Sequence, residues 1–182
     1  MKLSLQLFAA IIGLVVCTAG CSSDDNDFVN ADVVRINLSD STIAVGEGSV
    51  VAVEFSFSSN AVFSNEKTLY LVIRLDSSLM LREGTSEIDG FTSSADKSVG
   101  AQITECPESG ETILLYALDR FDLDEADNPS GDADARLNFT IDGIAADSEA
   151  IISARADDEN LMQSCETSLV PEAVTSLIVA GV

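Results

Sequence analysis

The chain has 182 residues and a formal net charge of -22, from 31 acidic and nine basic side chains. A surface this negative repels nucleic acid and anionic lipid, and this excludes both as direct partners. The sequence contains no histidine, so it lacks the imidazole base of serine and cysteine nucleophiles and the usual ligands of catalytic zinc. We therefore expect no enzyme. A salt-rich environment would explain the acidity without any further function.

The chain opens with the layout of a secretory signal peptide. Lys2 supplies a positive charge, an apolar run follows over residues 3–16, and Thr18-Ala19-Gly20 offers small residues for cleavage. The apolar run is shorter than the roughly 20 residues of a membrane-spanning helix. We predict a signal peptide helix over residues 1–20, with an uncleaved anchor as an alternative.

The small residues and the cysteine after them, Thr18-Ala19-Gly20-Cys21, resemble a bacterial lipobox. Thr18 departs from that pattern, in which leucine is more common. The resemblance implies that Cys21 becomes the acylated first residue of the mature protein, and a thiol suits the thioether bond to a lipid. Ser22 resembles the outer-membrane sorting pattern of Gram-negative lipoproteins. This implies a lipid anchor at the cell envelope, on the periplasmic or the external side, with ordinary secretion as the alternative.

The residues after Cys21 divide into a tether and a domain. Residues 22–30, SSDDNDFVN, are mostly polar and acidic, a composition typical of an extended linker. Residues 31–182 are enough for one domain with a substantial core. We therefore predict an acylated cysteine and tether over residues 21–30 and a folded domain over residues 31–182.

The hydrophobic pattern of the domain has period two, which predicts β-strands with one buried and one solvated face. The predicted inward-facing residues are Val51, Val53, Phe55, Phe57, Leu69, Leu71, Ile73, Leu75, Leu137, Phe139 and Ile141. Weaker strand candidates cover residues 33–38, 42–45, 101–105, 112–118, 150–156 and 174–179. Glycine, proline, serine and asparagine mark the turns between them. We predict an all-β, immunoglobulin-like antiparallel β-sandwich of eight or nine strands.

Two cysteines, Cys106 and Cys165, follow Cys21 in the chain. An even pair in an exported protein predicts one disulfide bond. A metal pair and a reactive thiol are the alternatives. Neither is supported, because no third cysteine lies nearby and the chain has no histidine.

Four stretches resemble the conserved-repeat immunoglobulin-like modules of bacterial surface proteins, known as domain of unknown function eleven. They are VVAVEFSFSSN, LYLVIRLDSSLMLREGTSEIDG, GDADARLNFTIDG and AIISARAD, within residues 49–157. The chain departs from that family in having one copy, a cysteine pair and an acidic insertion at 119–134, and cohesin-like modules fit nearly as well. The resemblance implies a non-enzymatic surface module with a structural, adhesive or assembly-accessory role, a protein partner and no catalytic residues.

Carboxylates crowd the segment DRFDLDEADNPSGDAD, residues 119–134. Clustered oxygen ligands are what Ca²⁺ requires, although the spacing is not that of an EF-hand. The predicted calcium ligands are Asp122, Asp124, Asp127 and Asp132. The alternative is a solvated acidic loop without metal, and we expect no other cofactor.

A carbohydrate-binding module is a further alternative. Such modules present exposed aromatic rings to the sugar, and the chain has no tryptophan. Tyr70 and Tyr116 are the candidate rings, unless they pack at the edge of the core.

Overall fold

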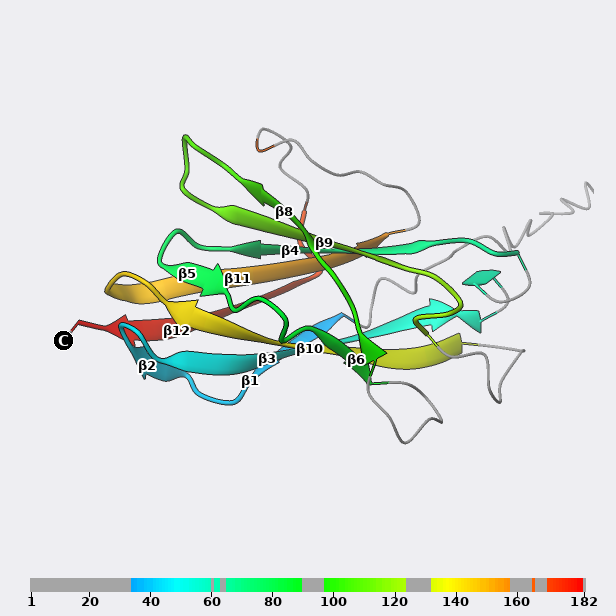
Figure 1. Ribbon diagram of the computed structural model, residues 1–182, viewed down its shortest axis with the longest axis horizontal. Coiled ribbons are helices and arrows are strands. Elements are labelled where there is room, and N and C mark those ends of the chain that lie inside the picture. Colours follow the sequence, from blue (N-terminus) through cyan, green and yellow to red (C-terminus); the bar gives the residue numbers. More distant parts are fainter. Residues whose placement is uncertain are drawn as a thin grey trace, which may run out of the picture.

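The computed structural model describes residues 34–59, 61–62, 65–89, 97–123, 132–157, 165 and 170–181. Within these residues the chain forms twelve strands in two sheets. Most strands run along the long axis of the molecule (Figure 1). The alternating apolar residues predict this arrangement, because each sheet must hide one apolar face against the other.

Sheet A has the strand order β1–β3–β10–β6–β7, and β5 also pairs with β10. Its strands are β1 (Arg35–Leu38), β3 (Gly48–Ser58), β5 (Leu79–Leu81), β6 (Glu87–Asp89), β7 (Lys97–Ser98) and β10 (Asp132–Gly143). The antiparallel pair β3–β10 is the longest in the molecule's described part, with register from Gly48 opposite Asp142 to Ser58 opposite Asp132. This pair forms the centre of sheet A.

Sheet B has the strand order β2–β12–β11–β4–β9–β8. Its strands are β2 (Thr42–Ala44), β4 (Leu69–Leu75), β8 (Gln102–Glu105), β9 (Thr112–Leu118), β11 (Asp147–Asp157) and β12 (Ala173–Ala180). The pair β2–β12 is parallel, and the other pairs of the sheet are antiparallel. The chain thus passes from sheet A to sheet B between β1 and β2.

The inner faces of both sheets meet in one apolar core. Every side chain predicted to face inward is at most 1% exposed, and all of them belong to the same cluster of buried residues. Burying one such side chain contributes roughly 1.5–3 kcal/mol relative to leaving it in water. The predicted all-β, immunoglobulin-like sandwich is therefore confirmed, with its strand phase.

The predicted number of strands, eight or nine, is too low. The additional strands are β5, β6 and β7, which have two or three residues each. In β6 only Ile88 is buried, between exposed Glu87 and Asp89. A period of two cannot be recognised in so short a run, because alternation needs at least about four residues.

The signal peptide helix predicted over residues 1–20 and the tether over residues 21–30 lie outside the described residues. Cys21 lies outside them as well, so the domain boundaries and the lipid anchor stay predictions. The described part of the chain contains no helix with the length and apolar character needed to cross a membrane.

Candidate functional site

The outer face of sheet B is rich in apolar side chains, although outward positions of a sandwich are commonly polar. On β4 and β9 these outward side chains are Val72, Ile113 and Leu115, and they are only 5%, 2% and 1% exposed. They form a second apolar cluster with Cys106, and Tyr70 packs against it. We call Val72, Ile113, Leu115 and Cys106 the covered half of this face. The sequence predicts a solvated outer face on β4, and for Val72 that prediction is wrong.

A disulfide bond joins Cys106 to Cys165, with the two Cα atoms 5.5 Å apart. That separation lies in the ordinary range for a disulfide, and the predicted pairing is confirmed. Cys165 belongs to the connection between β11, which ends at Asp157, and β12, which begins at Ala173. The bond therefore ties Cys165 to Cys106 of the covered half.

A tight turn places Cys106 directly after β8. The amide of Gly110 donates to the carbonyl of Cys106 at 2.7 Å, and the amide of Cys106 donates to the carbonyl of Glu111 at 2.8 Å. Gly110 has a φ of +74°, and a Cβ atom there would lie 2.9 Å from the Cβ atom of Ser77. Only glycine satisfies both conditions without strain, so the turn and the disulfide depend on it.

On β11 and β12 the outward apolar side chains are open to solvent. Ile151, Val174 and Ile178 are 45%, 59% and 47% exposed, and Val170, shortly before β12, is 74% exposed. We call these four residues the open row. The covered half and the open row thus lie on one face of one sheet, on neighbouring strands.

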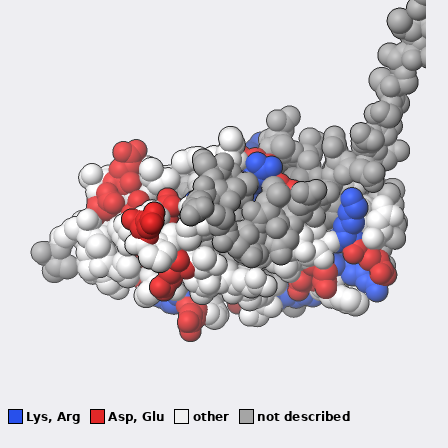
Figure 2. All heavy atoms as spheres, turned by 90° about the horizontal axis from the view of Figure 1, so that it is seen from above, with Lys and Arg blue, Asp and Glu red and all other residues white. Residues whose placement is uncertain are grey.

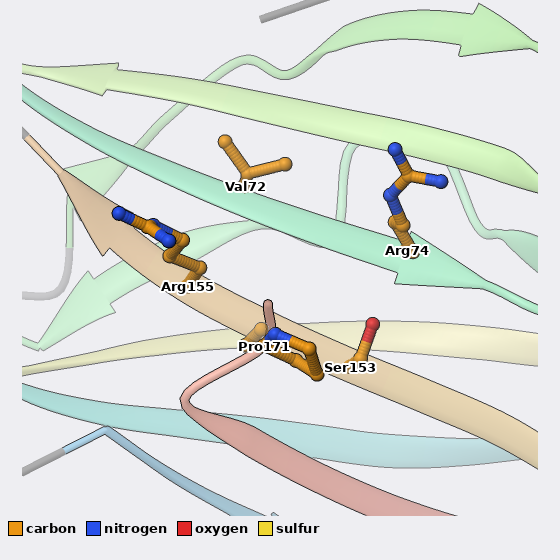
Figure 3. Close-up of a pocket in the computed structure, with 6 residues that line it drawn as sticks. Val72, Arg74, Ser153, Arg155 and Pro171 are labelled. Atoms are coloured by element: carbon orange, nitrogen blue, oxygen red, sulfur yellow. The ribbon is translucent and has the colours of Figure 1, made fainter. Parts of the chain in front are cut away.

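A shallow hollow marks the boundary between the covered half and the open row (Figure 3). Its lining comes from β4, β11 and the residue that precedes β12 by two positions: Val72, Arg74, Ser153, Ala154, Arg155 and Pro171. In Figure 3 the two arginines lie on either side of Val72. Its cavity volume of about 10 Å³ is far below the roughly 300 Å³ of small-molecule sites, so a small ligand does not fit there.

Both arginines of the hollow lie against carboxylates. Nη2 and Nε of Arg155 donate to Oδ2 of Asp157 at 2.8 Å and 3.1 Å. Nη1 of Arg74 lies 3.5 Å from Oε2 of Glu111. Each positive charge is therefore offset locally, and the hollow is not an anion site. On the face that Figure 2 shows, carboxylates outnumber the basic groups, and basic groups lie next to several of them.

Glu172 ends the pairing of β11 with β12. Its amide donates to the carbonyl of Ala154 at 3.0 Å, and its Oε2 accepts from the amide of Ala156 at 3.1 Å. The side chain thus satisfies a strand amide where the main chain of β12 no longer runs alongside. Burial raises the pKa of the Glu172 carboxyl, while the bond from Ala156 and the charge of Arg155 oppose that effect and Asp157 adds to it.

The outer face of sheet A is polar and charged instead. Arg35, Glu54, Arg136 and Asp89 are successive register partners across β1, β3, β10 and β6, so their charges alternate along one row. We call them the charge ladder. A cavity of about 290 Å³ opens beside it, lined by Arg35, Glu54, Phe55, Asp134, Ala135 and Arg136. Opposite charges face each other in this lining, and such pairs stabilise a sheet rather than present one sign to a ligand.

The predicted calcium site lies mostly outside the described residues. Of its four ligands the structure describes the side chain of Asp122, whose Oδ2 accepts from the amide of Asp119 at 3.1 Å. Asp124, Asp127 and the side chain of Asp132 are outside. The described residues contain no group of three or more candidate ligands. Calcium binding stays a prediction, and an unchanged thermal midpoint on adding a chelator would remove it.

The two tyrosines do not act as exposed platforms for a sugar. Tyr116 is fully buried, and its hydroxyl lies 2.8 Å from Oγ of Ser86. Burial raises the pKa of the Tyr116 hydroxyl, and the bond to Ser86 lowers it by less. Tyr70 packs against the covered half. Tyr116 therefore packs in the core, and Tyr70 is partly buried against the covered half.

The sequence did not single out the open row, although part of the signal is present. In β11 the small and apolar residues Ala150, Ile152, Ala154 and Ala156 alternate, and this leaves Ile151 on the other face. In β12 three apolar residues are consecutive, Leu177 to Val179, so the pattern does not assign a face to Ile178.

No protein-family model and no curated protein matches the sequence. Among solved structures, the chain is similar to the N-terminal domain of the Streptococcus gordonii adhesin Sgo0707. The TM-score is 0.51 at 9% sequence identity, over 81% of this chain and 32% of that one.

Two further structures resemble the chain less closely. The Corynebacterium diphtheriae major pilin SpaA matches with a TM-score of 0.49 and 14% identity, over 78% of this chain and 34% of that one. AvmM, which catalyses macrocyclization in alchivemycin A biosynthesis, matches with a TM-score of 0.41 and 12% identity, over 81% and 89%. The chain spans about a third of the length of the adhesin and pilin structures. The likeness to the adhesin establishes the fold, an immunoglobulin-like β-sandwich, and a fold alone does not define an activity.

Proposed function

We propose that the protein is an envelope-anchored, non-enzymatic lipoprotein whose β-sandwich is a structural, adhesive or assembly-accessory module with a protein partner. The observation that supports this proposal most concerns the outer face of sheet B. There the open row lies beside a hollow that is too shallow for a small ligand. Faces of this kind suit contacts with other proteins. The same fold in a bacterial adhesin supports this reading.

The ionisable groups with a shifted pKa lie apart from one another in the described residues. Active sites bring such groups together in one cleft. In the described part of the chain, the groups with a shifted pKa are Arg82, Tyr116 and Glu172, all of them raised. Tyr116 is in the core, Arg82 is bonded to Asp142 of β10, and Glu172 directly precedes β12. They do not form a common site.

The anchor of this proposal is a lipid on Cys21. The described domain begins at Val34, and the residues between them, when fully extended, span at most about 45 Å. That length is sufficient to hold a sandwich clear of lipid headgroups. More than one acyl chain makes such an anchor stable, since each buried CH₂ contributes about 0.8 kcal/mol.

Incorporation of labelled fatty acid tests the anchor. Cells that express the wild type should yield labelled protein, and Cys21→Ala should abolish the label. Cys17→Ala is the matched control, because Cys17 lies within the predicted signal peptide, and this variant should keep the label. Equal labelling of Cys21→Ala and the wild type would exclude the anchor.

A further inference from the structure

The open row is continuous along β12 and β11. Val174 and Ile178 face outward on β12 on either side of Ser176, and Ser176 is the register partner of Ile151 on β11. Ile151 is therefore the diagonal neighbour of both, within reach of apolar side chains on one face of a strand pair. Within β12, from Val174 to Ile178, the row extends for about 13 Å, at about 3.3 Å per residue.

The covered half shows that apolar side chains on the outer face of sheet B can be buried. There, outward residues of β4 and β9 are almost completely buried next to the disulfide. The open row has the same apolar character, but its side chains are about half exposed or more. Single exposed apolar residues are common on protein surfaces, whereas a continuous row marks a contact site.

The charges around the open row are mainly acidic. Glu149 lies two residues from Ile151 on the same face of β11. Glu172 lies in the sequence between Val170 and Val174, and Asp76 is held next to Ile151 because its amide donates to the Ile151 carbonyl at 3.0 Å. The two arginines of the hollow lie against carboxylates and do not reverse this charge. A partner with lysine or arginine at the flanks of its apolar residues is therefore electrostatically complementary.

A second copy of this chain does not suit the open row as a binding partner. A stable dimer buries about 800 Å² on each partner, which is more than the four side chains of the open row supply. The acidic surroundings of both copies would then have to meet, at a net charge of -22 per chain. A short extended segment of another protein needs only the row itself.

We propose that the open row binds an extended segment of another protein that presents apolar side chains on one face and basic residues at its flanks. This inference rests on the proposed function, since it names the partner chemistry of the surface module. The apolar side chains of the segment cover Ile151, Val174 and Ile178, and its basic flanks lie near Glu149 and Glu172.

Peptide binding tests the proposal, with protein purified from cells in mild detergent. The probe is a fluorescent peptide of alternating valine and threonine flanked by lysines, and the comparison probe carries glutamates in place of the lysines. Fluorescence anisotropy should show that the basic peptide binds at least about tenfold more tightly than the acidic one. Ile151→Ser should raise the Kd of the basic peptide by about tenfold.

Val50→Ser is the matched control. Val50 and Ile151 are both 45% exposed, but Val50 lies on β3 in sheet A, so its replacement should leave the Kd unchanged. Failure of the basic peptide to bind, or an equal loss in both variants, would overturn the proposal. So would a wild-type dimer in sedimentation that Ile151→Ser dissociates. If the protein incorporates fatty acid but binds neither peptide, this inference alone is contradicted. If it incorporates no fatty acid but binds the basic peptide, the lipid anchor alone is contradicted.

Discussion

On the outside of sheet A, four neighbouring strands carry the charge ladder of Arg35, Glu54, Arg136 and Asp89. On the outside of sheet B, the central strands β4, β9 and β11 carry apolar residues such as Val72, Leu115 and Ile151. Both sheets contribute equally apolar inner faces to the core. The formation of the core therefore does not explain why one outer face is charged and the other apolar.

The outer face of sheet A is suited to contact with solvent. Its opposite charges on adjacent strands attract each other and remain hydrated. On sheet B, one half of the outer face is buried next to the disulfide and the other half is exposed. An outward side chain of a strand can thus be buried, hydrated, or left exposed for contact with another molecule.

Removing the disulfide should have the largest effect on this contrast. The bond spans a sequence separation of 59 residues, and in the chain-entropy model its loss lowers the free energy of unfolding by about 4 kcal/mol. The double variant Cys106→Ser/Cys165→Ser should lose about that much in a urea titration, with increased binding of a hydrophobic dye. A loss below about 1 kcal/mol would show that the connection from β11 to β12 stays in place without the bond.

Truncating a residue of the covered half should have the next largest effect. Leu115 is 1% exposed, so Leu115→Ala should lower the free energy of unfolding by about 2–3 kcal/mol. Ile151→Ala, at an outward position of the same sheet, should cost less than about 1 kcal/mol. Urea titrations of both variants measure the difference, and equal losses would mean that the two halves are alike.

Reversing one charge of the charge ladder should have a smaller effect. Glu54→Lys would place a lysine between Arg35 and Arg136 and lower the free energy of unfolding by about 1 kcal/mol at low salt. About 1 M salt should remove most of this loss, because it screens exposed charges. Ser176→Lys, in the middle of the open row, is the control: its lysine meets acidic surroundings, so salt should not raise the stability of this variant.

The pH dependence of Glu172 should give the smallest effect. Burial raises the pKa of this carboxyl in the folded protein, so the folded state holds the proton more tightly than the unfolded state. The resulting stabilisation is fully present below the ordinary glutamate pKa and is lost as the pH rises through the higher folded value.

Glu172→Gln keeps an acceptor for the amide of Ala156 and removes the titration. Over that pH window the wild type should therefore lose stability relative to the variant, as measured by urea midpoints from acid to neutral pH. A difference that stays constant with pH would contradict the shift.

Much of the fold is predictable because long strands repeat their pattern. In β3, β4 and β10 the alternation of apolar residues identifies both the strand and its buried face. The cysteine pair likewise predicts its bond. The short strands β5, β6 and β7 are not predictable in this way, because their pairing to neighbours rather than a local pattern defines them.

The candidate site is less predictable than the fold. The sequence places Val72 on the outside of β4, but only the three-dimensional path of the chain determines that it is buried while Ile151 is exposed. The sequence also does not show which side chains of β12 face the core, because Leu177, Ile178 and Val179 are all apolar. Long-range contacts, which no local pattern encodes, decide both points.

The parallel pairing of β2 with β12 has a mechanical consequence. β2 lies near the first described residue, and β12 ends one residue before the last one, Gly181. A pull applied to the two sides of the domain would drag these strands past each other lengthwise, so the contacts at Thr42, Ile43 and Ala44 would bear the load together instead of opening in turn. In this pair the first strand of sheet B along the chain is held directly by its last strand, so the pair resists stretching of the domain.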